Sequence, residues 1–372
     1  MALFVVVLAA VAAAAVRAGA PVIPPLSPGC LPAVDGQQDL WCPGAEGAGA
    51  KNPLDSTYKC YKIPSLVRTW NGTVLAFIEA RKLNCGDQGY VDLRMRRSLD
   101  GGKTWLPSQM IHGESTTSSH VTIGDACPTW DAARGMVHLV FTRNNADVFY
   151  TRSTDEGATW APPRNISGMV DGHRGPGNFI GTGHAGGLQL RRTGRLLVPM
   201  HGPCHMIYSD DGGETWAKAP GAMSNGGECQ VAEIRPGLLI VSGRNDGTGY
   251  TEIAYSTDDG MTWNTSTPNH DLRSPVGGCE ASIVQHPNGM LYHSAPDSLL
   301  LRSKMVVKVS ADQGHTWRNH RHVWDKAAGY SALSVLGNDT DVDAPLGLLY
   351  DRDDRPHIIF EAHGITFTSF PP

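Results

Sequence analysis

Apolar residues occur along this chain in short runs, and most of the runs are separated by turns that contain glycine, proline or asparagine. Turn pairs such as Asn71-Gly72 and Arg134-Gly135 stand directly before such runs. Runs of this length are typical of β-strands, whereas the apolar spacing of amphipathic helices is scarce. We therefore predict an all-β fold with strands at residues 74–77, 137–141, 196–198, 238–242, 306–309, 347–350 and 357–360.

An eight-residue phrase, Ser-x-Asp-x-Gly-x-Thr-Trp, recurs between these runs. Its copies begin at Ser98, Ser153, Ser209, Ser256 and Ser310, so they are 55, 56, 47 and 54 residues apart. A period near 50 residues is typical of propeller blades, since each unit needs its neighbours to bury its apolar face. The phrase itself fits a hairpin turn, in which the Asp accepts hydrogen bonds from backbone amides and the Gly allows a positive φ.

Five copies and a last unit without one, around residues 333–370, predict a six-bladed β-propeller that occupies residues 56–372. In each copy we expect the Thr and Trp to begin the outgoing strand, with the Trp side chain covering the edge of the blade. Such turn phrases, called Asp boxes, are shared by unrelated propellers. They therefore predict the fold and leave the chemistry open.

Composition agrees with an ordered globular protein. Apolar residues make up 41% of the 372 residues and charged residues 18%, and the 43 glycines and 25 prolines suit many short strands and turns. The formal net charge is −5, and the sequence contains no run of basic residues. We therefore expect no nucleic-acid partner.

The N-terminal segment differs from the rest of the chain. Residues 2–16 are apolar and are followed by Arg17 and the small residues Ala18-Gly19-Ala20. This pattern predicts a signal peptide at residues 1–20 and a secreted or lysosomal protein, although no Lys or Arg precedes the apolar run. A membrane anchor is the alternative, but a span needs about 20 apolar residues, so we expect no stable span. Residues 21–55 are rich in Pro, Gly and Ala and predict a leader over the domain surface.

Two further features suit the secretory pathway. Acceptor triplets for N-glycans begin at Asn71, Asn165, Asn264 and Asn338. Eight cysteines form an even set, as disulfides require, but their spacing does not define the pairing. They are Cys30, Cys42, Cys60, Cys85, Cys127, Cys204, Cys229 and Cys279.

Several segments outside the octads resemble the motifs of the exo-α-sialidase (neuraminidase) family, in particular the animal lysosomal-type and bacterial sialidases. The resemblance covers the chain from about residue 39 to its C-terminus, and the order and spacing of the motifs make it specific. The segments are Tyr61-Lys62-Ile63-Pro64, Glu79-Ala80-Arg81 with Gly86-Asp87-Gln88-Gly89, Glu228-Cys229-Gln230 with Arg244 sixteen residues later, Arg302, and Gly329-Tyr330-Ser331.

This resemblance implies a retaining exo-α-sialidase whose substrate is a sialylated glycoconjugate. The anomeric carbon of a sialoside carries a carboxylate, which would repel a carboxylate nucleophile, and sialidases use a tyrosine instead. Tyr330 is the expected nucleophile, and Glu228 would accept its proton. Asp87 would protonate the leaving oxygen and later activate water. The alternative roles are a packed tyrosine, a paired surface glutamate and a solvated loop aspartate.

The resemblance also implies a cluster of arginines around the substrate carboxylate, because a planar guanidinium can bind a carboxylate through two hydrogen bonds. Arg244 and Arg302 match two of the three family positions. Lys62 stands where the family usually has the third arginine, and an ammonium lacks the two-pronged geometry. Lys62 either contacts the carboxylate more weakly or points to solvent. In the second case Arg81 or Lys82 could replace it.

The remaining candidates are secondary. Arg81 would contact the substrate or orient Asp87, and Asp351 stands where the family usually carries a glutamate that steadies the first arginine. Glu280 would line the glycerol or N-acyl pocket or lie on the surface. His184 lies in a glycine-rich loop that resembles one at the rim of the family's site. The other histidines show no ligand spacing, so we expect no catalytic metal and no cofactor.

Three other functions remain as alternatives to hydrolysis. Lys62 favours a sialic-acid-binding lectin with weakened or lost catalysis, and the presence of Asp87, Glu228 and Tyr330 argues against it. A receptor propeller would share only the Asp boxes. A trans-sialidase would use the same residues as a hydrolase and differ in its acceptor site. The preferred sialic acid, its linkage, the pH optimum and the oligomeric state are not encoded in any motif that we identify.

Overall fold

The computed structural model describes residues 30–32, 34–44, 58–170, 179–356 and 364–372. Within these ranges the regular structure is β, with 24 strands and one short 3₁₀ helix, η1 (Ser167–Met169). The predicted all-β class is confirmed. Six of the seven predicted strand segments lie inside observed strands, and the seventh, at residues 357–360, falls outside the described residues.

Three of the sheets have four strands each, which follow one another in antiparallel order. The first contains β2 (Cys60–Arg68), β3 (Val74–Arg81), β4 (Val91–Ser98) and β5 (Gln109–His112). The second contains β6 (Ile123–Asp131), β7 (Met136–Arg143), β8 (Asp147–Ser153) and β9 (Arg164–Asn165). Another contains β15 (Cys229–Arg235), β16 (Leu238–Gly243), β17 (Tyr250–Ser256) and β18 (Thr267–Arg273).

The two other sheets depart from this simple order. In one, the short strands β10 (Gly181–Thr182) and β11 (Leu188–Gln189) both pair with β12 (Leu196–His201), which is followed by β13 (His205–Ser209) and β14 (Ala217–Ala222). The other has seven strands in the order β1-β24-β23-β22-β21-β20-β19. Its strands are β1 (Gln37–Trp41), β19 (Ser282–Gln285), β20 (Leu291–Pro296), β21 (Ser303–Ser310), β22 (Arg318–Val335), β23 (Leu346–Arg352) and β24 (Gly364–Phe370).

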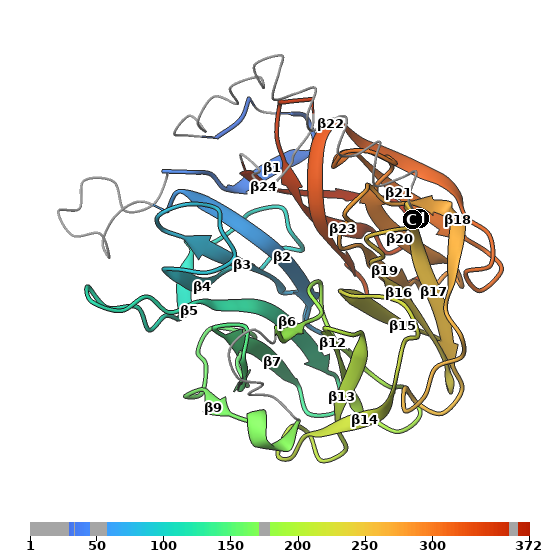
Figure 1. Cartoon of the computed structure of the whole chain (residues 1–372), viewed down its shortest axis with the longest axis horizontal. Helices are drawn as coiled ribbons and strands as arrows, with labels where there is room; N and C mark the ends of the chain where they lie inside the picture. Colours follow the sequence, from blue (N-terminus) through green and yellow to red (C-terminus); the bar gives the residue numbers. More distant parts are fainter. Residues whose placement is uncertain (1–29, 33, 45–57, 171–178, 357–363) are drawn as a thin grey trace.

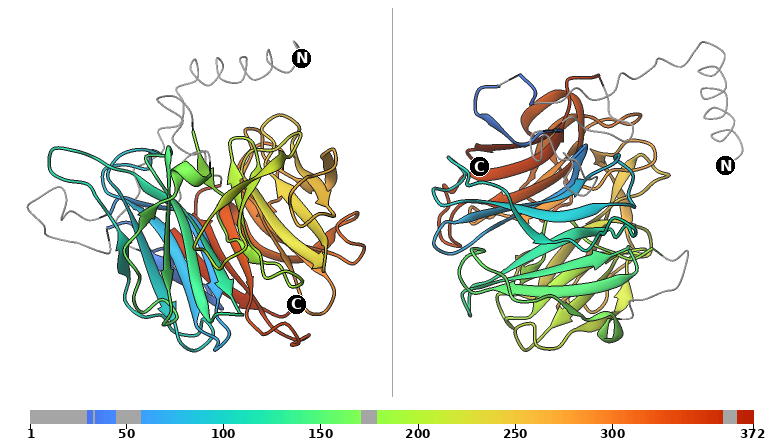
Figure 2. Two further views of the ribbon diagram at one scale, coloured as in Figure 1. Left: turned by 90° about the horizontal axis from the view of Figure 1, so that it is seen from below. Right: turned by 90° about the vertical axis from the view of Figure 1, so that its left-hand side faces the viewer.

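The sheets are arranged around a central axis like the blades of a propeller (Figure 1). The innermost strands contact one another in turn, β2 beside β6 and β15 beside β19, and the ring closes where β22 lies beside β2. The strands run roughly along this axis (Figure 2, left). Because the inner strands converge, residues far apart in sequence meet at the ends of the axis.

The apolar core lies mainly between neighbouring sheets. Phe77 and Met95 of the first sheet pack with Leu139 and Phe141 of the second. The octad tryptophans add to these layers: Trp160 lies edge-on to Phe77 of the preceding sheet, with ring centroids 5.8 Å apart. The octad tryptophan therefore packs between two neighbouring sheets, and covering the edge of its own blade is the smaller part of its role.

The octads form the hairpin turns that the sequence predicts, but the prediction that the Thr and Trp begin the outgoing strand is wrong, because that strand begins after the Trp in every copy. In the copy that begins at Ser310, the carboxylate of Asp312 accepts hydrogen bonds from the backbone N–H and the hydroxyl of Thr316, at 2.9 and 2.6 Å. The Ser310 hydroxyl donates to the same carboxylate at 2.8 Å. Strand β18 adds further bonds, because Asn269 Nδ2 donates to Gly314 O at 3.3 Å and Asp271 Oδ2 accepts from the backbone N–H of Trp317 at 3.0 Å.

The predicted leader at residues 21–55 is partly wrong, because residues 37–41 form strand β1, which pairs with β24. Trp41 is buried, with 1% of its surface exposed, and its ring packs near Tyr61 of the first sheet. Two apolar residues in a polar, glycine-rich stretch are too weak a signal for a strand, so the sequence did not reveal it. The predicted signal peptide at residues 1–20 lies outside the described residues.

Three disulfides are present among the described residues: Cys30–Cys42, Cys60–Cys85 and Cys204–Cys229. Cys127 and Cys279 are buried free thiols, so the even number of cysteines does not mean that all are paired. The four acceptor asparagines of the N-glycan triplets are all exposed. Within the described ranges, no helix has the length and apolar character to cross a membrane.

Candidate active site

Three inner strands carry a β-bulge near the same end of the axis. The pairing register shifts between Lys62 and Ser65 in β2, between Gly124 and Cys127 in β6, and between Ala328 and Ser331 in β22. A bulge bends its strand and turns side chains out of their normal alternation, and such bulges are common beside active sites. Here they direct side chains of three sheets toward the axis.

At this end lies a pocket of about 480 Å³, lined by residues from five of the predicted segments. The structure brings together seven of the eight predicted site residues there: Lys62, Arg81, Asp87, Glu228, Arg244, Arg302 and Tyr330. The eighth, Asp351, is fully buried and lies directly behind Tyr330, whose backbone N–H donates to Asp351 Oδ2 at 3.2 Å. The roles of these residues remain predictions.

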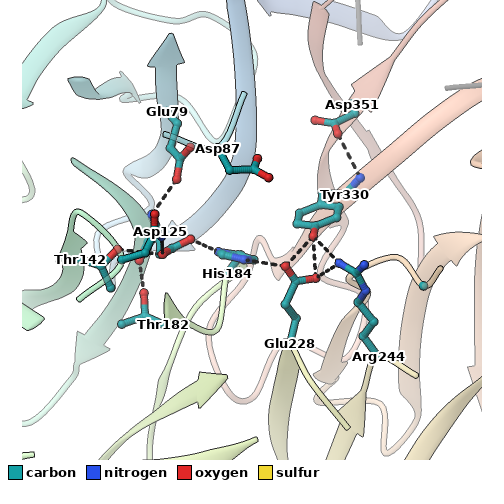
Figure 3. A network of polar contacts seen from close by, with 12 residues as sticks. Glu79, Asp87, Asp125, Thr142, Thr182, His184, Glu228, Arg244, Tyr330 and Asp351 are labelled. Atoms are coloured by element: carbon teal, nitrogen blue, oxygen red, sulfur yellow. Dashed lines mark hydrogen bonds and ion pairs between the residues drawn. The ribbon is translucent and has the colours of Figure 1, made fainter. Parts of the chain in front are cut away.

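Tyr330, Glu228 and Arg244 form a tight group (Figure 3). The Tyr330 hydroxyl donates to the Glu228 carboxylate, with its oxygen 2.5 and 2.6 Å from the two carboxylate oxygens. Arg244 Nη1 donates both to Glu228 Oε2 at 2.7 Å and to Tyr330 Oη at 2.8 Å. A phenol is thus held against a base and a cation, which is the arrangement of an activated nucleophile.

The protonation states in this group follow from burial and charge. Burial by itself would raise the pKa of Glu228, but His184 and Arg244 outweigh it and hold the pKa well below its ordinary value. Burial and the Glu228 carboxylate raise the pKa of Tyr330 well above 10, although Arg244 and Arg302 oppose this. In the resting site the phenol is therefore neutral and the carboxylate is charged.

The cationic side of the pocket contains Arg302 and Lys62. The Arg302 guanidinium lies over the Tyr330 ring, 5.1 Å from its centroid, and donates to Gly278 O. Lys62 is only 5% exposed, so the reading in which it points to solvent is wrong. Burial lowers the pKa of Lys62, and the Asp351 carboxylate opposes that shift.

Arg81 lines the pocket and lies between two carboxylates. Its Nη2 is 2.6 Å from Glu79 Oε2, and its Nη1 is 2.8 Å from Asp87 Oδ1. Arg81 therefore orients Asp87 and the loop around it. The Asp87 side chain is 81% exposed and projects into the mouth of the pocket. Lys82 pairs with Asp92 at 3.0 Å, and it does not line the pocket.

Two secondary candidates differ from their expected positions. Glu280 is fully buried, so the surface role that the sequence left open is wrong, and burial raises its pKa well above the ordinary value. Nor does Glu280 line the pocket. His184 lies deeper than the rim: it is 1% exposed and its ring is 5.6 Å from that of Tyr330.

Sequence reasoning missed Asp125, which lines the pocket from the bulge of β6. Its φ is 55°, a left-handed value that is costly for a residue other than glycine and is often found at functional sites. The Gly124-Asp125 pair inside an otherwise strand-like run was the available signal, because glycine in a strand often marks a bulge.

One group of side chains near the pocket has metal-ligand chemistry. Ligand atoms of Asp125, His184 and His201 lie within 4.8 Å of one another. His184, however, already lies between two carboxylates, as an imidazolium would. Another group, Cys30 with Asp39 and Cys42, contains a disulfide and has no thiolate to offer. The absence of a catalytic metal stays a prediction.

Comparison with known proteins adds independent information. The family of BNR repeat-like domains matches residues 63–343. A sialidase of Bacteroides fragilis (strain YCH46) is 29% identical over 359 residues, which cover 85% of this chain and 64% of that protein. Sialidase-3 of Rattus norvegicus is 30% identical over 320 residues, which cover 72% of this chain and 75% of that protein.

Solved structures agree with these relatives. Hadza microbial sialidase Hz136 is 26% identical, with a TM-score of 0.70 over 84% of this chain and 66% of that one. The NanB sialidase from Streptococcus pneumoniae is 16% identical, with a TM-score of 0.74 over 91% of this chain and 71% of that one, and it supports the fold alone. The chain spans 64% and 53% of the lengths of two bacterial sialidases, those of Bacteroides fragilis and Micromonospora viridifaciens.

Proposed function

This chain belongs to the sialidase family, and we propose that it is a retaining exo-α-sialidase that releases terminal sialic acids through a tyrosyl-enzyme intermediate. The observation that carries the proposal is the short contact of the Tyr330 hydroxyl with both oxygens of Glu228. A phenol without a base would be a poor nucleophile, and a carboxylate nucleophile would be repelled by the substrate carboxylate.

In the first step Tyr330 Oη attacks the anomeric carbon while the glycosidic bond breaks. The phenol proton moves to Glu228, and Asp87 donates a proton to the leaving oxygen. In the second step water attacks the same carbon from the vacated side and gives a proton to Asp87, and Tyr330 leaves and recovers its proton from Glu228. Two displacements at one carbon give net retention.

Asp87 is suited to the acid and base role because its carboxyl group is open to solvent, whereas the carboxyl group of Glu228 is largely buried. It can exchange its proton with water between turnovers. Arg81 holds its oxygen at 2.8 Å and so fixes its direction toward the leaving group.

Arg244, Arg302 and Lys62 would bind the substrate carboxylate. Their cationic groups line one pocket with Tyr330, and Asp351 balances the buried ammonium. Ionised donors bind a carboxylate more strongly than neutral ones, so the site attracts anionic sugars before any other group is recognised.

A fluorogenic sialoside assay tests the proposal. Wild-type protein should release the fluorophore, and NMR of the first product should show the α-anomer. Tyr330→Phe keeps the ring but has no nucleophilic oxygen, so its turnover should fall by roughly three orders of magnitude or more. Equal rates for wild type and Tyr330→Phe would overturn the tyrosyl intermediate.

The second candidate function is a sialic-acid-binding lectin, and Lys62 is the feature that favours it. A lectin would bind free sialic acid and show no turnover in wild type or in Tyr330→Phe. If the wild-type protein binds sialic acid but shows no turnover at any pH from 4 to 8, the lectin function is correct and the proposed sialidase function is wrong.

We also propose a six-bladed count and a secretory protein with N-glycans. The count is supported by β22, which pairs with β21 through residues 318–327 and with β23 through residues 328–335, so that each half of the seven-stranded sheet has four strands. The exposed acceptor asparagines suit glycosylation. The proposal of a secretory protein with N-glycans is tested by expression in animal cells. The protein should appear in the medium, and its mass should decrease after N-glycan removal.

A further inference from the structure

The imidazole of His184 lies between two carboxylates deep in the site (Figure 3). Its Nδ1 is 3.5 Å from Asp125 Oδ1, and its Nε2 is 3.6 Å from Glu228 Oε1. These are ion-pair distances, and only 1% of the residue's surface is exposed. The loop that carries His184 joins β10 to β11, at the position that an inner strand fills in other sheets.

Asp125 is held firmly in place on the far side of the ring. Its Oδ2 accepts hydrogen bonds from Thr142 Oγ1 at 2.7 Å and from Asn145 Nδ2 at 3.0 Å. Its backbone N–H donates to Glu79 Oε1 at 2.9 Å. A left-handed backbone costs about 1–3 kcal/mol and persists only where the surroundings fix it, as these bonds do. The carboxylate that faces His184 is therefore a fixed partner.

The charges around the ring favour an imidazolium. Burial by itself would lower the pKa of His184, but the Glu228 contact and the Asp125 carboxylate outweigh it and raise the pKa to about 9. Burial raises the pKa of Asp125, and the positive charge of His184 opposes this shift. Burial lowers the pKa of His201 to about 3, so His201 stays neutral. The titratable groups that face the His184 ring are Asp125, Glu228, Glu280, His201 and Tyr330.

We propose that His184 is a positioning residue for the base: held by Asp125, its imidazolium keeps Glu228 ionised and directed at Tyr330. This inference rests on the proposed sialidase function. When Glu228 takes up the phenol proton, its charge is lost and the imidazolium keeps Asp125 as its counter-ion. No bond forms at His184, so the residue acts through Glu228 and does not touch the substrate carbon.

His138 provides a matched control, because it is also a buried histidine between a carboxylate and a tyrosine. Its ring nitrogens lie 2.8 Å from Tyr150 Oη and 3.3 Å from Asp131 Oδ2, within the second sheet. His138 does not line the pocket, and burial lowers its pKa. A loss that comes only from removing a buried imidazole should therefore appear equally in His138→Gln and His184→Gln.

The first test compares pH–rate profiles of these two variants with wild type. In His184→Gln, Glu228 loses a positive neighbour, so the acidic limb of kcat/KM should move up by about one pH unit. We expect kcat to fall about 10- to 100-fold and KM to change less than about threefold. His138→Gln should keep the wild-type limbs. An unmoved acidic limb in active His184→Gln would overturn the proposal.

Chemical rescue separates charge from packing. His184→Ala leaves a space for a small ring, and added imidazole should restore at least about a tenth of the lost kcat at pH values where it is protonated. Pyrazole has the same shape but stays uncharged, so it should not rescue. Equal rescue by both rings would show that His184 only fills space.

A measurement without turnover keeps this inference apart from the proposed function. NMR of ¹³C-labelled histidine should show His184 as an imidazolium at pH 8, while the buried His293, whose pKa burial lowers to about 3, stays neutral. Glu228→Gln should lower the His184 pKa. A neutral His184 at pH 7 would overturn the inference, whereas a charged His184 in a protein that cleaves no sialoside would overturn only the proposed function.

Discussion

At the scale of single residues, the unusual feature of the site is a buried lysine where the family resemblance implies an arginine. Lys62 is 5% exposed and lines the pocket, and burial lowers its pKa against the effect of Asp351. An ammonium is a compact donor without the two-pronged geometry of a guanidinium. Lys62 would then attract the substrate carboxylate by its positive charge but could not bind it through two parallel hydrogen bonds.

This predicts a measurable contribution of Lys62 to binding. Lys62→Met has a similar length and no charge, and the loss of one charge-assisted hydrogen bond, about 1–3 kcal/mol, should weaken sialic-acid binding about 10- to 100-fold. Titration calorimetry with free sialic acid measures the effect. Lys62→Arg should bind at least as tightly as wild type. Identical affinities in all three proteins would show that Lys62 does not contact the carboxylate.

The sequence located seven of the pocket residues because each lies in a motif of the family, but it did not show how they interact. It also did not reveal Asp125, which lines the same pocket. Asp125 comes from a bulge whose left-handed residue is an aspartate, and nothing in the local sequence places it beside His184, 59 positions later. Only the convergence of inner strands brings such residues together.

At the scale of elements, the loop that carries Asp87 is tied to the strand that carries Lys62. The Cys60–Cys85 disulfide joins the first residue of β2 to this loop, across a sequence separation of 25. Cys85 O also accepts a hydrogen bond from Arg81 Nη1 at 2.7 Å. The bridge therefore restrains the distance between Asp87, the proposed acid, and Lys62, the proposed carboxylate contact on β2.

Removal of this bridge should change kinetics as well as stability. Cys60→Ser with Cys85→Ser should cost about 3 kcal/mol of unfolding free energy by loop entropy, and the looser Asp87 should lower kcat/KM about tenfold. Cys30→Ser with Cys42→Ser is the control: it should lose stability and keep kcat/KM, because that bridge lies away from the pocket. If the variant without the Cys60–Cys85 bridge keeps the wild-type kcat/KM, this bridge does not position Asp87.

The octad turns should make the fold sensitive to strong acid. Hydrogen bonds from the Thr316 hydroxyl and backbone lower the pKa of Asp312 to about 2, and those from Thr104 lower the pKa of Asp100 to about 2. Because these values lie below the ordinary one, the stabilisation is present above about pH 4 and is lost as pH falls toward 2. Asp312→Asn with Asp100→Asn should flatten the fall of melting temperature between pH 4 and 2. An unchanged slope in scanning calorimetry would contradict this.

At the scale of the whole molecule, the outer edge of the seven-stranded sheet is completed by a strand that the sequence did not reveal. β1 pairs with β24, while Trp41 at its end reaches the first sheet: its Nε1 donates to Ser108 Oγ at 3.3 Å, and Arg96 lies over its ring. The repeat predicted the propeller well because five octads mark their hairpins in the sequence. The pairing of β1 with β24 has no repeat to mark it and joins residues that are far apart in the sequence.

Trp41→Ala should therefore open the joint between the last and the first sheet. A cavity of this size in a buried site costs about 3–5 kcal/mol. Trp70→Ala is the control, since Trp70 is 55% exposed and its loss should be nearly neutral. Denaturant unfolding measures both. Equal stability of the two variants would show that Trp41 is not needed to hold the last sheet against the first.

The proposed function depends on a covalent bond between Tyr330, activated by Glu228, and the anomeric carbon of a sialic acid. Rapid acid quench of the protein during turnover, followed by digestion and mass spectrometry, tests it most directly. We expect a sialic-acid adduct on the peptide that contains Tyr330, and no adduct in Tyr330→Phe. An adduct on the Glu228 or Asp87 peptide, or turnover with inversion and no adduct, would contradict it.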